Sequence, residues 1–122
     1  MLDELRDRIT HYLAQNRGCV VSTSGATGAW AVPAQFQSRG LEIDCLLPAW
    51  SDALYHLEKD PHALVIVPDA HSGAMRWLEY RGIAQVNPYG GDERYVAIHF
   101  KPERVDLIDE GRGWGARETL DL

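Results

Sequence analysis

The C-terminal segment gathers residue types that suit the binding of a flat, negatively charged ligand. Arg112, Trp114 and Arg117 lie within six residues of one another, and Gly111, Gly113 and Gly115 separate them. A tryptophan ring can cover a planar molecule, and guanidinium groups bind phosphate or carboxylate in a bidentate manner. We therefore expect residues 109–122 to be an ordered tail that packs on the rest of the domain or on a partner subunit.

A second candidate region precedes a predicted short helix. Trp50 stands immediately before Ser51, a residue type that often caps a helix N-terminus, and residues 51–59 have helical character up to Asp60-Pro61. Helix N-termini attract anions. Here, however, Asp52 and Ala53 occupy the first turn, so the helix offers no cation of its own to a phosphate group.

Other common chemistries find little support in the sequence. The five histidines, His11, His56, His62, His71 and His99, show no zinc-protease spacing, and no Gly-x-Ser-x-Gly motif is present. His56 and His71 are candidate haem ligands, although the expectation for each is a surface residue. Cys19 and Cys45 lie in apolar runs without a Cys-x-x-Cys spacing, which predicts two buried free thiols. We expect no metal site.

Composition limits the partners of the chain. The 122 residues carry a formal net charge of −6, with 45% hydrophobic and 25% charged residues, as in ordinary globular domains. Binding to nucleic acid or to an anionic membrane requires a basic face, so the charge argues against both. Ten of the twelve cations are arginine, which leaves room for a local anion site. We expect a single cytoplasmic domain spanning residues 1–122.

The elements that position these residues follow from changes in periodicity. Leu2, Leu5, Ile9 and Leu13 share one helical face, and residues 16–18 should end that helix. The pattern then predicts a mainly β fold: a six- to seven-stranded antiparallel barrel with this N-terminal helix and a short helix after the third strand. The predicted strands cover residues 19–23, 29–37, 41–47, 62–67, 75–86, 94–100 and 104–108, with turns at 24–28, 38–40 and 69–73.

The order of these elements resembles the pyridoxamine phosphate oxidase-like, FMN-binding split barrels. Residues 28–36 are similar to the second strand of that family, which often reads Pro-x-x-x-Pro-x-x-Phe after a glycine turn. Residues 51–61 match the following helix with its Leu-x-x-Asp-Pro ending, and residues 76–86 match a strand marked by Gly-x-Ala-x-Val. The similarity extends over nearly the whole chain.

The resemblance implies a flavoprotein with the split β-barrel fold. It implies a homodimer with two FMN sites between the subunits, and oxidoreductase chemistry supplied by the flavin on a small molecule. Together with the residue chemistry described above, it leads us to predict cofactor binding by Pro33, Leu47, Pro48, Trp50, Ser51, Arg76, Arg112, Trp114 and Arg117.

The sequence departs from the family at the phosphate clamp. The family holds the FMN phosphate with a Ser-Arg-Lys run, which reads Ser51-Asp52-Ala53 here. Three interpretations stay open. Arginines elsewhere (Arg76, Arg81, Arg112 or Arg117) could supply the charge. The pocket could bind another planar ligand, such as a deazaflavin or haem. Or the chain could be a non-catalytic dimer without a cofactor.

Overall fold

The N-terminal helix packs against the barrel through one apolar face. The computed structural model describes residues 2–25, 28–71 and 75–122, with α1 at Leu2–Gln15. Leu5, Ile9, Tyr12 and Leu13 are buried, as the helical spacing predicts. Asn16 ends the helix, because its side-chain amide donates to the Tyr12 carbonyl at 2.8 Å.

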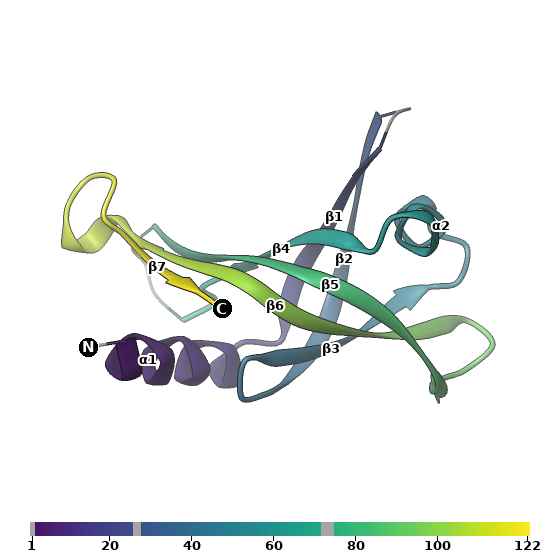
Figure 1. Cartoon of the computed structure of the whole chain (residues 1–122), viewed down its shortest axis with the longest axis horizontal. Coiled ribbons are helices and arrows are strands. Elements are labelled where there is room, and N and C mark those ends of the chain that lie inside the picture. Colours follow the sequence, from purple (N-terminus) through teal and green to yellow (C-terminus); the bar gives the residue numbers. More distant parts are fainter. Residues whose placement is uncertain (1, 26–27, 72–74) are drawn as a thin grey trace.

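Seven antiparallel strands form the sheet, and six of them close into a barrel (Figure 1). The sheet order is β3-β2-β1-β4-β5-β6-β7, and an additional pairing of β3 with β6 closes the barrel. The seventh strand pairs only with β6. The strands are β1 (Gly18–Gly25), β2 (Gly28–Arg39), β3 (Glu42–Pro48), β4 (His62–Pro68), β5 (Arg76–Gly91), β6 (Tyr95–Asp109) and β7 (Arg117–Asp121). This architecture confirms the predicted split barrel.

The short helix after the third strand is also confirmed. Helix α2 spans Asp52–Lys59, and the Ser51 hydroxyl oxygen accepts a hydrogen bond from the Leu54 amide at 3.3 Å. Ala53, Leu54 and Leu57 are buried against β1 and β2. The turn predicted at 38–40 lies at 40–41 instead, because Ser38 and Arg39 still pair with β3; Gly40 has a φ of +63°. The predicted turns at 24–28 and 69–73 include residues 26, 27, 72 and 73, which lie outside the described residues.

The last strands differ from the prediction in length and number. The two strands expected at 94–100 and 104–108 form the single strand β6, which begins at Tyr95. β6 continues through Pro102, which pairs with Gly82 of β5. The register shifts beside it, because the consecutive residues Arg81 and Gly82 pair with Arg104 and Pro102. Glu103 is thus the extra residue of a bulge in β6, where the missing amide proton of Pro102 is tolerated. The tail contains a short 3-10 helix at Glu110–Arg112, which precedes β7, and Leu120 is buried.

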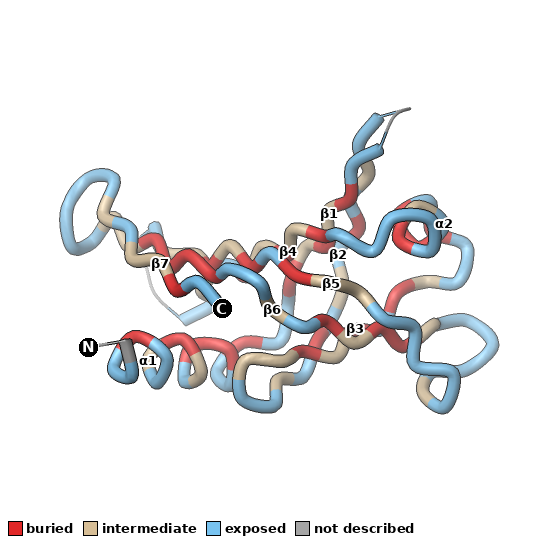
Figure 2. Tube along the Cα trace, viewed as in Figure 1, coloured by how far each residue is buried: buried red, intermediate tan, exposed pale blue. Residues whose placement is uncertain are grey.

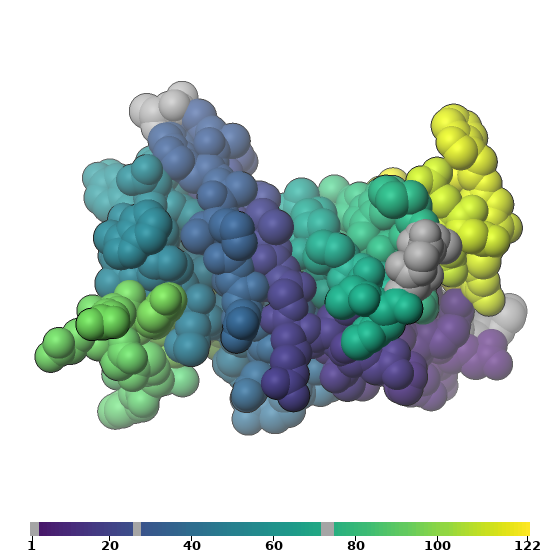
Figure 3. All heavy atoms as spheres, turned by 180° about the vertical axis from the view of Figure 1, so that it is seen from behind, coloured from purple at the N-terminus to yellow at the C-terminus, as the bar shows by residue number. Residues whose placement is uncertain are grey.

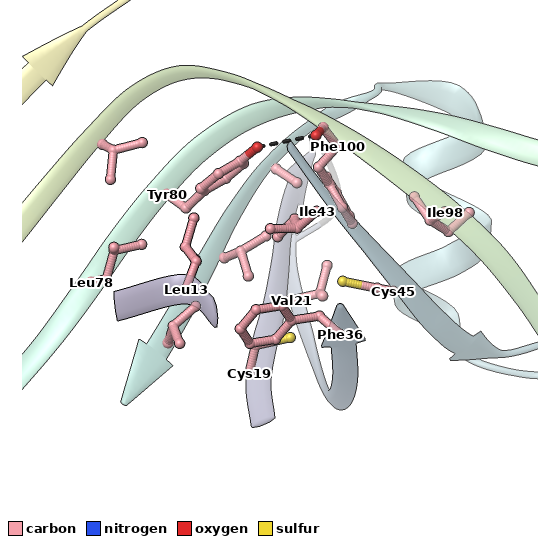
Figure 4. Packing of buried hydrophobic residues seen from close by; sticks show 14 of the residues in the cluster. Leu13, Cys19, Val21, Phe36, Ile43, Cys45, Leu78, Tyr80, Ile98 and Phe100 are labelled. Carbon is pink, nitrogen blue, oxygen red and sulfur yellow. Dashed lines mark hydrogen bonds between the residues drawn. The ribbon is translucent and has the colours of Figure 1, made fainter. Parts of the chain in front are cut away.

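The hydrophobic core fills the barrel and the space above α1 (Figure 2). Tyr80, Phe100 and Ile43 are completely buried. The Tyr80 hydroxyl lies 3.0 Å from the carbonyl oxygen of Phe100 (Figure 4) and 2.7 Å from that of Leu41, so its proton is shared between them. Cys19 and Cys45 are buried free thiols, as predicted. A hydrogen bond with Cys19, together with burial, raises the pKa of Cys45 well above its usual range. In the described residues, no helix is long and apolar enough to span a membrane.

Candidate cofactor site

A groove runs over the outer face of β2, β3 and β6. Side chains alternate between the two faces of a strand, so Phe36 and Leu47 fill the core while Gln35, Leu46 and Pro48 face outward. β3 pairs with both β2 and β6, and the outward residues of the three strands therefore form one continuous surface.

The apolar end of the groove is made of two adjoining hollows. The first, of about 540 Å³, is lined by Pro33, Ala34, Gln35, Leu46, Pro48 and Tyr95. The second, of about 330 Å³, shares Gln35 and Leu46 with it and also includes Ala97 and Gly91. Leu46 and Tyr95 are 45% and 44% exposed. An apolar floor edged by glutamine amides suits a flat ring system with heteroatoms on its rim.

The other end of the groove is polar. The Nδ1 atom of His99 lies 2.7 Å from Asp44 Oδ1, and its Nε2 atom lies 2.5 Å from Glu42 Oε1. Burial lowers the pKa of His99, but its hydrogen bonds to the two carboxylates outweigh this effect, and the pKa is raised overall. The imidazole is thus stabilised in its charged form, with both ring nitrogens already engaged.

The start of α2 does not form a phosphate clamp. Ser51 is buried, and its hydroxyl already caps the helix. The hollow there is lined by Trp50, Ser51, Asp52, Tyr55 and Glu58, together with Ala49 and Leu54. Two carboxylates and no cation line it, so this end of the helix disfavours a phosphate group. Trp50 is largely exposed beside it.

The four remaining predicted residues lie at the opposite end of the molecule. Figures 1 and 3 show the tail at one end and α2, with the hairpin between β5 and β6, at the other. Arg76 lies 3.4 Å from Asp69 and 3.8 Å from Asp109, with its guanidinium 5.0 Å from the centre of the Tyr12 ring. The side chain of Trp114 is 95% exposed.

The two tail arginines are held by carboxylates of the same chain. Arg112 Nη1 donates to Glu118 Oε1 at 2.9 Å, and Arg117 Nη2 donates to Glu79 Oε1 at 3.2 Å. A single chain therefore brings Pro33 and Pro48 into one hollow of the groove. Leu47, between them and the barrel interior, faces the core. Trp50 and Ser51 line the separate hollow at the start of α2. It does not bring Arg76, Arg112, Trp114 or Arg117 to that groove, and their role in binding stays a prediction.

Several groove residues escaped the sequence analysis. Gln35, Leu46, Tyr95 and Ala97 were not singled out, although each follows the alternation of a half-buried strand. The alternation places them on the outer face, but only the closure of β3 onto β6 brings Leu46 beside Ala97. Among the described residues, no group of three His, Cys, Asp or Glu side chains could hold a metal ion.

Comparison with known proteins identifies the fold. No protein-family model and no curated protein sequence matches the chain. Among solved structures, the general stress protein 26 of Bacillus anthracis str. Sterne is similar, with a TM-score of 0.75, 18% identity, and coverage of 98% of this chain and 99% of that one. A putative pyridoxamine 5'-phosphate oxidase from Listeria innocua gives a TM-score of 0.72 at 18% identity, covering 85% and 98%.

Other structures of this fold are described as binding different cofactors. A FAD-binding protein from Mesorhizobium loti matches with a TM-score of 0.66 at 14% identity, covering 80% of this chain and 89% of that one. A heme binding protein from Mycobacterium smegmatis (0.77, 15%, covering 95% and 57%) and an F420 reductase (0.65, 16%, covering 78% and 93%) also match. The chain thus has the split-barrel fold of the pyridoxamine 5'-phosphate oxidase-like proteins. Its structural neighbours include flavin-, F420- and haem-associated proteins.

Proposed function

We propose that the protein is a homodimeric flavin-binding split barrel that binds FMN in the groove over β2, β3 and β6. The groove carries this proposal: two adjoining apolar hollows edged by Gln35 and Gln37 offer a flat surface of the kind that an isoalloxazine ring needs. The cofactor-binding descriptions of the structural neighbours support it. The flavin would supply redox chemistry, and the protein would act as an oxidoreductase on a small molecule.

A second copy of the chain completes this site in our proposal. Leu46 and Tyr95 are each almost half exposed in the groove, and a partner subunit would cover them. The tail lies at the end of the chain remote from its own groove, so Arg112, Trp114 and Arg117 would contribute only to the groove of the partner. These residues would supply the positive charge that Asp52 and Ala53 do not provide.

Two measurements test this proposal. The visible spectrum of the purified protein reports a bound chromophore, and titration of the colourless protein with FMN, followed by quenching of flavin fluorescence, gives the affinity. Flavin absorption near ~450 nm or saturable quenching supports the proposal. A Soret band indicates haem instead, and a protein that neither absorbs nor quenches is not a flavoprotein. Light scattering after gel filtration tests the dimer.

A matched pair of variants locates the site. Leu46→Glu places a charge in the groove, and Leu122→Glu makes the same change at a residue of similar exposure, 50%, at the C-terminus. We expect Leu46→Glu to weaken FMN binding and dimerisation at least ~10-fold, because a buried unpaired carboxylate is costly. Leu122→Glu should leave both unchanged. Equal effects of the two substitutions contradict the placement of cofactor and partner in the groove.

A further inference from the structure

Three arginines gather on the outer face of β5, β6 and β7, in a cluster that shares no residue with the groove of the same chain. Arg81 and Arg104 are direct cross-strand partners, and Arg117 belongs to the neighbouring strand β7. Side chains of like charge directly opposite each other repel. The repulsion between these arginines therefore has to be offset by negative charge. Carboxylates two residues further along the same face of β5 and β6 supply it.

Two carboxylates between the arginines provide this compensation. The Asp106 side chain is fully buried, and its Oδ2 atom accepts hydrogen bonds from Arg81 Nη1 at 3.1 Å and from Arg104 Nε at 3.2 Å. The Thr119 hydroxyl donates to its other oxygen. Glu79 accepts from Arg117 Nη2 at 3.2 Å and from the Trp77 indole N–H at 3.0 Å.

The three guanidinium groups have N–H donors that make no hydrogen bond within the cluster. Each guanidinium has five N–H donors. Within the cluster, Arg81 and Arg117 each donate one hydrogen bond, and Arg104 donates two, to Asp106. The three side chains are each about 45% exposed, whereas Asp106 and Glu79 are 0% and 17% exposed. The carboxylates lie beneath, the guanidinium groups lie toward solvent, and three positive charges face two negative ones.

A hollow next to the cluster gives room for the rest of a ligand. It measures about 430 Å³, lies over β1, β4 and β5, and has Arg81 in its wall with Ser22 and His62. Its lining also includes Thr23, whose buried hydroxyl has no hydrogen-bond partner among the described residues. Two exposed carboxylates border the region: Glu103 in the hollow, and Asp121 opposite Arg104 on β7.

We propose that Arg81, Arg104 and Arg117 form a binding site for a phosphate group on the outer face of β5, β6 and β7. Guanidinium groups held side by side by buried carboxylates are oriented in advance for the several oxygens of a phosphate. The phosphate could be free or part of a larger molecule seated in the adjacent hollow. Arg117 is common to this proposal and to the proposed flavin site of the partner, whereas Arg81 and Arg104 belong to this site alone, so the experiment uses variants of these two.

Calorimetric titration with inorganic pyrophosphate tests the site. We expect saturable binding, weakened about tenfold by Arg104→Gln and by Arg81→Gln through the loss of charge-assisted hydrogen bonds. Arg39→Gln is the matched control, because Arg39 lies on β2 and its only described ion pair is a 3.9 Å contact with Asp44. Pyrophosphate binding that is absent, or that falls equally in Arg39→Gln, overturns the proposal.

Arg81→Gln and Arg104→Gln remove partners of buried Asp106 and can therefore destabilise the fold. Asp121→Asn is a second test of the site that avoids this effect. Removing the exposed carboxylate opposite Arg104 leaves that network intact and should tighten pyrophosphate binding severalfold. An unchanged or weaker affinity in this variant contradicts the site.

Comparing FMN with riboflavin identifies the source of the phosphate. A preference for FMN that Arg104→Gln abolishes assigns the site to an esterified phosphate, and pyrophosphate binding without that preference assigns it to a free anion.

Discussion

Asp44 and His99 face each other across the seam that closes the barrel. They are direct register partners of β3 and β6, with 2.7 Å between Asp44 Oδ1 and His99 Nδ1. Glu42, two residues away on the same face of β3, engages the other ring nitrogen. One imidazole therefore links the two strands through two carboxylates, at the polar end of the groove.

This contact predicts a pH dependence of stability. The pKa of His99 is raised in the folded protein, so its contribution is complete below the ordinary pKa of about 6.5 and is lost as the pH rises through the folded value. We expect His99→Gln to lower the free energy of unfolding by at most about 1 kcal/mol near pH 6, because the two carboxylates are partly solvated. The difference between wild type and variant should shrink toward pH 9 in urea denaturation. A difference that grows with pH would show that His99 is bound as the neutral ring.

The Tyr80 hydroxyl offers a test of the core. Its single proton is shared between the carbonyl oxygens of Leu41 and Phe100, and Tyr80→Phe leaves both without this donor. We expect a loss of about 1–3 kcal/mol in the free energy of unfolding, measured with urea. Tyr89→Phe makes the same chemical change at a residue that is 97% exposed and should change the stability by less than ~0.5 kcal/mol. Similar losses in the two variants would be incompatible with this role of the hydroxyl.

The sequence predicted the order of the strands and helices better than it predicted where the individual strands begin and end. Short strands separated by turn residues, with Ser51 and Asp60-Pro61 bounding a helix, were sufficient for the order of elements. The two strands expected on either side of Pro102 are one strand, because an extra residue, Glu103, lets β6 shift its register against β5 and continue. This pairing decides whether the strand is interrupted, and the local sequence does not show it.

The candidate sites depend on contacts that are distant in the sequence. Arg81, Arg104 and Arg117 lie in three separate segments, and only the register of β5, β6 and β7 places them around Asp106. A weak signal was present: an acidic or hydroxyl residue stands two positions from each arginine, as Glu79, Asp106 and Thr119. Such spacing puts both residues on one face of a strand, but it does not tell which strands are neighbours.

The tail should be released by loss of one ion pair. Arg8 on α1 contacts Glu118 on β7 through two hydrogen bonds, of 2.7 and 2.6 Å. Both side chains are more than a third exposed, so Arg8→Ala should lower global stability by no more than ~1 kcal/mol. We expect a clear local effect, namely faster hydrogen exchange of the β7 amides. Arg39→Ala is the control, and unchanged protection of β7 in Arg8→Ala would show that its pairing with β6 and the burial of Leu120 hold the strand without the ion pair.

The two thiols should be inert in the folded protein. Cys19 and Cys45 are buried, and the pKa of Cys45 is raised, so little thiolate is present or reachable. We expect a thiol reagent at about pH 8 to label neither residue in native buffer and to label both rapidly in denaturant. The native labelling rate should follow the unfolding equilibrium, rising in destabilised variants such as Tyr80→Phe. Rapid labelling of the native protein would place at least one thiol outside the core.

At Gly82 the backbone of the neighbouring strand leaves no room for a side chain, although the local sequence does not indicate this. A Cβ atom built there lies 2.6 Å from the Lys101 carbonyl oxygen on β6, the strand that carries the bulge, whereas one at Gly18 meets nothing within 4 Å. Gly82→Ala must therefore move β6 away from β5, and we expect a loss of about 1–3 kcal/mol in the free energy of unfolding. Gly18→Ala should be neutral or stabilise the protein by up to ~1 kcal/mol, because it restricts the unfolded chain. Urea denaturation of the two variants separates these effects. If the two substitutions change the free energy of unfolding equally, β6 can move away from Gly82 at little cost. The bulge would then not fix the register on which the Arg81–Arg104 pairing depends.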